Sequence, residues 1–265
     1  MTPPLLRCPA CGVINPGPVR ECVACGTIIP GSAVGPNAMS DVPSEGVPGA
    51  TEDPELAGWR RVRGVAHIFI GSVAVALGGI GAAKLGAEEL PVDLALTVVV
   101  AVVALTALAF GWKTLSPALR TTGGVRGLLT AGTGLVFIAG FAHVYFHAFR
   151  WLGFPFVRYT DIYIEAGFPI WSAYLLIALA PAICEELVFR GYVSARLSEL
   201  LSPNETLVVQ AALFALLHLS PVIFPSHLLM GVVLGIVRRR SGSLYPSMLT
   251  HAAWNAYVVF SEVGL

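Results

Sequence analysis

The sequence has few charged residues: Asp, Glu, Lys and Arg make up 12% of its 265 residues, whereas soluble domains contain about 25%. Its hydrophobic fraction is 55%, above the roughly 45–50% that is usual for soluble proteins. These values exclude a disordered chain and disfavour an ordinary soluble enzyme. Sixteen basic residues balance sixteen acidic ones, so no basic surplus is available for nucleic acid, and no nucleic-acid partner is expected. The composition indicates a polytopic membrane protein.

Cysteine is also scarce, and four of the five cysteines lie within the first 25 residues. They form two Cys-x-x-Cys pairs, each followed by glycine: Cys8, Cys11, Cys22 and Cys25. Such pairs are typical of a zinc ribbon, because each tight turn lets two thiolates bind one tetrahedral ion. Two disulfides or a rubredoxin-type iron site are the alternatives. We predict a zinc-ribbon domain over residues 1–29, which is a possible docking site for a partner protein. Cys184 is interpreted as a small buried hydrophobe.

Residues 30–58 lack aromatic residues and isoleucine and are rich in Pro, Gly, Ala and Ser. Such a segment cannot bury enough apolar surface to fold, so we predict a flexible linker. Residues 59–265 are predicted to be a transmembrane helical domain, since their apolar runs approach the roughly 20 residues that span a bilayer. Seven runs are visible, at about 64–83, 94–112, 127–149, from 168 onward, 206–221, 224–237 and 244–260. The predicted fold class is an all-α polytopic membrane protein with about seven transmembrane helices, preceded by a small zinc-ribbon domain.

Basic residues near the ends of these runs predict the orientation in the membrane. One set of alternating connections contains Arg60, Arg61, Arg63, Lys113, Arg120, Arg126, Arg190, Arg196, Arg238, Arg239 and Arg240. The other set contains only Lys84, Arg150 and Arg158. The positive-inside rule places the first set in the cytoplasm. We therefore expect a multi-pass protein of the cell (inner) membrane, surrounded by lipids, with a cytoplasmic N-terminus.

The last hundred residues place ionisable and polar side chains inside apolar runs, although each charge costs about 2.5–3.5 kcal/mol there. They are Glu185, Glu186, Arg190, His218, His251 and Asn255. Helix–helix hydrogen bonding is the simple explanation, and it suits Arg190, which can pair with Glu186 at i,i+4. His67 and His227 stand alone and are interpreted as packing or interface residues.

Helical rise predicts that several of these side chains meet. Glu185 and His218 each lie about 20 Å from a turn at residues 202–205, at 1.5 Å per residue. His251 and Asn255 are one turn apart on one helix face. We therefore predict one buried pocket that contains a carboxylate, two imidazoles and an amide.

Three motifs carry these residues. They read EExxxR over Glu185–Arg190, FxxxH over Phe214–His218 and HxxxN over His251–Asn255. In this the chain resembles the CPBP intramembrane proteases, which are related to the type II CAAX prenyl endopeptidases and are called Abi proteins in bacteria. The resemblance covers roughly residues 168–262, the predicted protease core. It covers neither the first three helices nor the ribbon.

The resemblance implies an intramembrane endopeptidase that hydrolyses membrane-associated or hydrophobic peptides. Glu185 would be the general base, and His218 would orient the attacking water. His251 and Asn255 would donate to the oxyanion. Glu186 and Arg190 would form a supporting ion pair.

A catalytic metal is left open by the sequence. Zinc accepts one glutamate and two histidines with water in the fourth position, and members of the family are commonly labelled metalloproteases. A metal-independent mechanism is favoured, because asparagine is a poor zinc ligand and a Glu-His-water arrangement suffices chemically. The predicted cofactor is therefore the ribbon zinc. The alternative function is a non-catalytic membrane adaptor or transporter with a zinc-ribbon docking module.

Overall fold

The computed structural model describes residues 6–7, 14–15, 22, 54–86, 89–154 and 158–263. The chain divides into two units, Met1–Ala57 and Gly58–Leu265. In the first unit, strands β1 (Leu6–Arg7) and β2 (Ile14–Asn15) pair antiparallel. Cys22 is buried. The other three cysteines of the predicted ribbon, Cys8, Cys11 and Cys25, lie outside the described residues, so the zinc ribbon stays a prediction.

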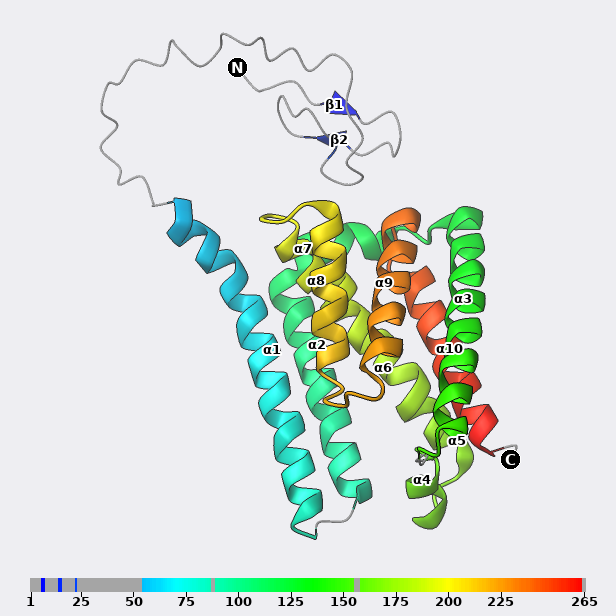
Figure 1. Cartoon of the computed structure of the whole chain (residues 1–265). Coiled ribbons are helices and arrows are strands. Elements are labelled where there is room, and N and C mark those ends of the chain that lie inside the picture. The colour runs from blue at the N-terminus through cyan, green and yellow to red at the C-terminus, as the bar shows by residue number, and fades with distance from the viewer. Residues whose placement is uncertain are drawn as a thin grey trace, which may run out of the picture. The chain divides into compact units, whose positions relative to one another are not determined.

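The second unit is helical, and each of the seven predicted apolar runs forms helix (Figure 1). The first part contains α1 (Pro54–Lys84), α2 (Glu89–Arg120), α3 (Gly124–Trp151) and the short α4 (Asp161–Glu165). One continuous helix follows, made of α5 (Ile170–Ala173), η1 (Tyr174–Leu179), α6 (Ala180–Glu185), η2 (Glu186–Val193) and α7 (Ser194–Leu197). The last part contains α8 (Pro203–Leu216), α9 (Phe224–Ser241) and α10 (Tyr245–Val263).

Four segments in the described part of the chain are long and apolar enough to cross a membrane: Val62–Lys84, Asp93–Arg120, Gly124–Trp151 and Ile170–Leu197. The chain is therefore a membrane protein. Crossing by α8, α9 and α10 stays a prediction. With 14 residues, α8 rises only about 21 Å, less than the roughly 30 Å of a hydrocarbon core. In Figure 1 the turn between α8 and α9 lies short of the far ends of α1 and α2.

Two predicted boundaries are corrected by the structure. The predicted linker, residues 30–58, overlaps α1, which begins at Pro54, because proline is well suited to the first turn of a helix. The predicted fifth run, 206–221, is helical only to Leu216. His218 therefore lies in the turn after α8, rather than inside a helix.

The start of α8 follows from its sequence. Ser202 and Glu205 form a capping box: the Ser202 hydroxyl accepts from the Glu205 backbone N–H at 3.4 Å, and the Glu205 carboxylate accepts from the Ser202 N–H at 2.8 Å. These bonds satisfy donors that every helix start leaves unpaired, and they lower the pKa of Glu205. The chain turns at residues 198–202, and residues 203–205 of the predicted turn form the start of α8.

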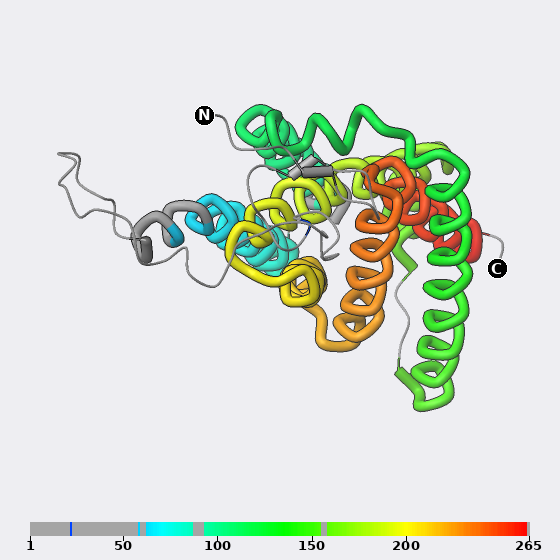
Figure 2. Tube along the Cα trace, turned by 90° about the horizontal axis from the view of Figure 1, so that it is seen from above, coloured from blue at the N-terminus to red at the C-terminus, as the bar shows by residue number. Residues whose placement is uncertain are grey.

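The end of α9 sets the position of α10. Gly242 ends α9 with a φ of 69°, a left-handed conformation that glycine adopts without strain. The Leu244 N–H then donates to the Ala118 carbonyl of α2 at 3.2 Å. In Figure 2 α3, α9 and α10 lie side by side, in agreement with their mutual contacts. This arrangement holds His251 of α10 next to the continuous helix that contains Glu185.

Candidate active site

Both glutamates lie where the continuous helix departs from regular α geometry. The segments η1 and η2 are π-helical. Such segments are rare and are frequently found at functional sites. Glu185 is the last residue of α6, and Glu186 is the first residue of η2. The helix therefore changes geometry between the two glutamates, and their side chains lie in different environments.

Glu186 and Arg190 form an ion pair in the interior of the protein. Arg190 Nη1 lies 2.9 Å from Glu186 Oε1, and both side chains are fully buried. Arg190 Nη2 also donates to the Gly231 carbonyl of α9 at 3.3 Å, and its guanidinium carbon lies 4.3 Å from the centre of the Phe214 ring. A buried ion pair needs such additional partners, because the desolvation cost otherwise exceeds the Coulombic gain.

Gly231 lets α9 approach α8 closely enough for this network. A Cβ at Gly231 would lie 2.9 Å from the Ala211 Cα, which is too close for any side chain. The Gly231 carbonyl accepts from Gln210 Nε2 at 3.1 Å as well as from Arg190. The sequence motifs did not identify Gln210 or Gly231, although a glutamine inside an apolar run was a signal that could have been used.

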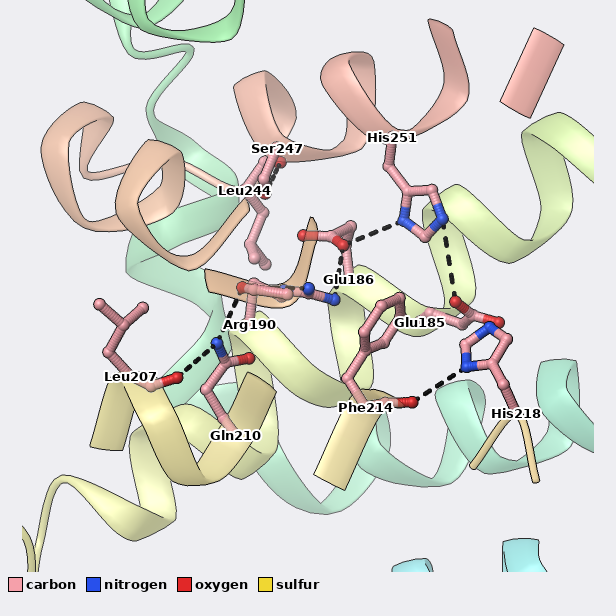
Figure 3. A network of polar contacts seen from close by, with 11 residues as sticks. Glu185, Glu186, Arg190, Leu207, Gln210, Phe214, His218, Leu244, Ser247 and His251 are labelled. Atoms are coloured by element: carbon pink, nitrogen blue, oxygen red, sulfur yellow. Dashed lines mark hydrogen bonds and ion pairs between the residues drawn. The ribbon is translucent and has the colours of Figure 1, made fainter. Parts of the chain in front are cut away.

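His251 joins the same network from α10. Its Nδ1 lies 3.1 Å from Glu186 Oε1, and its Nε2 lies 3.9 Å from Glu185 Oε2 (Figure 3). The second distance is longer than a hydrogen bond. The Glu185 side chain is 22% exposed, whereas that of Glu186 is 0% exposed. Glu186 is therefore held by Arg190 and His251, while Glu185 is accessible.

Glu185 and His218 line one cavity of about 200 Å³. Phe189 and Phe214 line it on the side of the catalytic motifs. The opposite wall is formed by α1 and α2, through Ser72, Val75, Ala76, Leu96, Val99, Val100 and Val103. The structure thus places Glu185 and His218 together, beside a mostly apolar space.

The hydrogen bonding of His218 defines its tautomer. Its Nδ1 lies 3.1 Å from the Phe214 carbonyl oxygen. A carbonyl only accepts, so Nδ1 carries the hydrogen and Nε2 of the neutral ring has a free lone pair. In Figure 3 this second nitrogen is turned toward the Glu185 carboxylate. His218 is therefore arranged to accept a hydrogen bond from a molecule in the cavity.

Phe214 is the common packing partner of the site. Its ring meets His218 edge to face at a centroid distance of 5.2 Å and His251 at 6.0 Å. The same ring receives the Arg190 guanidinium. Phe214, four residues before His218, therefore separates the buried ion pair of Glu186 and Arg190 from the Glu185 cavity.

His227 packs on the site, in agreement with its interpretation as a packing residue. It does not stand alone, because its ring centroid lies 4.0 Å from that of His218. The short turn between α8 and α9 brings the two together. An imidazole inside an apolar run was the signal, the same one that pointed to His218.

Asn255 makes its hydrogen bond outside the Glu185 cavity. Its Nδ2 donates to the Ile177 carbonyl at 3.1 Å. In a regular α-helix that carbonyl would accept from residue 181, but Pro181 has no N–H. Pro181 cannot pair the Ile177 carbonyl in the α-helical manner, and the bond from Asn255 to this carbonyl joins α10 to η1.

In the described part of the chain, no group of three or more His, Cys, Asp or Glu side chains is arranged to hold a metal ion.

Comparison with known proteins finds one similar family. Residues 167–257 match the family described as type II CAAX prenyl endopeptidase Rce1-like. Over this segment the chain is similar to the Rce1-like family. No curated protein and no solved structure matches the chain. The matched segment contains all three motifs, and the match supports an intramembrane CAAX-type protease at the level of the family. Helices α1 to α3 lie outside the match.

Proposed function

We propose that the chain is an intramembrane endopeptidase that cleaves membrane-associated or hydrophobic peptides, with Glu185 as the general base. The observation that carries the proposal is the shared cavity of Glu185 and His218, next to a buried network that leaves the Glu185 carboxylate accessible. The apolar wall of this cavity suits a hydrophobic substrate. Since α1 and α2 supply that wall and lie outside the family match, we propose that they contribute to the substrate preference of this chain.

Glu185 and His218 can each accept one hydrogen of the same water molecule. His218 Nε2 accepts one hydrogen of the water, and the Glu185 carboxylate takes the other as a proton while the oxygen attacks the peptide carbonyl carbon. The tetrahedral intermediate then collapses, the C–N bond breaks, and the proton on Glu185 passes to the leaving amine. General-base catalysis of this kind contributes about 10²- to 10⁴-fold.

His251 is the proposed donor to the oxyanion. Its Nδ1 is directed at Glu186, so Nε2 can donate when the ring is protonated on both nitrogens. Asn255 lies one turn further along α10 and is proposed to assist with its second amide hydrogen, since the first is directed at Ile177. Donors of this type are worth about 10²- to 10³-fold each.

We further propose that catalysis needs no metal. The four ribbon cysteines, Cys8, Cys11, Cys22 and Cys25, would bind one zinc ion, and the ribbon would dock a partner protein. A location in the cell (inner) membrane with the N-terminus in the cytoplasm is supported by the arginines at the cytoplasmic helix ends predicted above. The alternative, a membrane adaptor or transporter, needs neither an accessible carboxylate nor a paired imidazole.

Cleavage by the purified protein in lipid vesicles tests the proposal. A library of hydrophobic peptides is incubated with the protein, and products are identified by mass spectrometry. The measurement is repeated with a strong chelator on protein that lacks residues 1–50, so that ribbon zinc does not contribute. We expect cleavage that the chelator does not abolish. Absence of cleavage contradicts the protease function, and loss with chelator that zinc restores contradicts the metal-free mechanism.

A further inference from the structure

His218 lies in the turn after α8, outside any helix. α8 ends at Leu216, and Leu219 has a φ of 49°, in the left-handed region that a leucine rarely adopts. The Nδ1 bond to Phe214 restrains one edge of the ring. The orientation of the ring plane must therefore come from the side chains packed on it.

Two rings pack against His218. Phe214 meets it edge to face at 5.2 Å, with an interplanar angle of 67°. His227 lies at a centroid distance of 4.0 Å, with an angle of 48°. The closer contact is the one with His227, which comes from the first turn of α9.

His227 is itself fixed in place. Its Nδ1 lies 3.0 Å from the Ile223 carbonyl and 3.3 Å from the Ser226 hydroxyl. The Ser226 hydroxyl donates to the same Ile223 carbonyl at 2.8 Å, and Ser226 is buried. Since the ring of His227 is held at the start of α9, it can serve as a rigid support for a neighbouring ring.

We propose that His227 is a positioning residue of the active site, which acts by fixing the imidazole plane of His218. The inference rests on the proposed role of His218 in orienting water. His227 is not among the residues that line the Glu185 cavity, so it acts through His218. Misplacing a catalytic group by about 1 Å can cost about 10²-fold in rate.

The test compares His227→Ala and His227→Phe in the full-length protein in vesicles. His227→Ala removes the supporting ring and should lower kcat by about 10- to 100-fold, with KM changed less than about twofold. His227→Phe restores a ring of similar shape and should recover most of kcat. His67→Ala, an exposed histidine of α1, is the matched control and should cleave like the wild type. Thermal unfolding is measured for each variant.

The outcomes separate this inference from the proposed function. Wild-type kcat in His227→Ala overturns the inference alone, as does a His227→Phe protein that folds but is as slow as His227→Ala. A raised KM with unchanged kcat also overturns it. If His227→Ala does not fold, His227→Phe decides: wild-type-like kcat supports positioning by the ring, and loss overturns it. Absence of cleavage in both the wild type and His67→Ala contradicts the proposed function, and the inference with it.

Discussion

Asn255 and Pro181 are expected to be coupled through the Ile177 carbonyl. Asn255 Nδ2 donates to this carbonyl at 3.1 Å, and Pro181 cannot. The bond is part-buried, and leaving such a carbonyl unpaired costs up to about 1–3 kcal/mol. We therefore expect Asn255→Ala to lower the free energy of unfolding by about 1–3 kcal/mol, measured by denaturing-detergent titration with circular dichroism.

Pro181→Ala supplies the missing N–H, so that residue 181 can pair the Ile177 carbonyl in the usual helical manner. In the Pro181→Ala background, Asn255→Ala should then cost less, and the double-mutant cycle should give a coupling energy of about 0.5–3 kcal/mol. Pro117→Ala in α2 is the matched control, since Pro117 also lies inside a helix. It should leave the cost of Asn255→Ala unchanged.

Additive costs in the Asn255 and Pro181 cycle, or equal coupling with Pro117, would refute this account of Asn255. The same variants separate structure from catalysis. If Asn255 also donates to the oxyanion, Asn255→Ala lowers turnover by about 10²- to 10³-fold in both backgrounds. Recovery of turnover by Pro181→Ala would instead show that the role of Asn255 is structural.

Three further predictions concern the ion pair, the cavity and the ribbon. Glu186→Gln should lower the free energy of unfolding by about 3–5 kcal/mol, because it leaves Arg190 as an unpaired buried charge; wild-type stability in the same titration would contradict this. Ser72→Trp should fill the cavity and lower peptide cleavage at least about tenfold, from the loss of substrate positioning, whereas His67→Trp on the exposed side of α1 should not; equal rates would be inconsistent with substrate binding there. Metal analysis should find one zinc ion per chain bound to residues 1–29. A preparation that contains iron instead, or no metal, would contradict this prediction.

Local rules account for the parts of the fold that the sequence predicted. The helical runs follow from apolar length, and the start of α8 at Pro203 follows from its capping residues. The rise per residue on either side of the turn was sufficient to place Glu185 and His218 on one cavity. The spacing of Glu186 and Arg190 similarly indicated their ion pair.

Tertiary contacts decide the rest. Pro181 shows from sequence that a carbonyl loses its α-helical donor, but only the packing of α10 shows that Asn255 donates to it. His227 became part of the site because α8 ends early and the chain turns back, which hydropathy does not reveal. The cavity wall from α1 and α2 was also not predictable, because membrane helices carry apolar residues on the lipid-facing and the protein-facing sides alike.

Turnover of Glu185→Gln tests the central claim most directly. The substitution keeps the size of the side chain and its ability to accept hydrogen bonds but removes the proton acceptor. Single-turnover cleavage of a hydrophobic peptide in vesicles should fall by at least about 10²-fold, with unfolding unchanged. Glu165→Gln, at an exposed residue of α4, should cleave at the wild-type rate. Cleavage by folded Glu185→Gln at the wild-type rate would contradict the claim that Glu185 is the base.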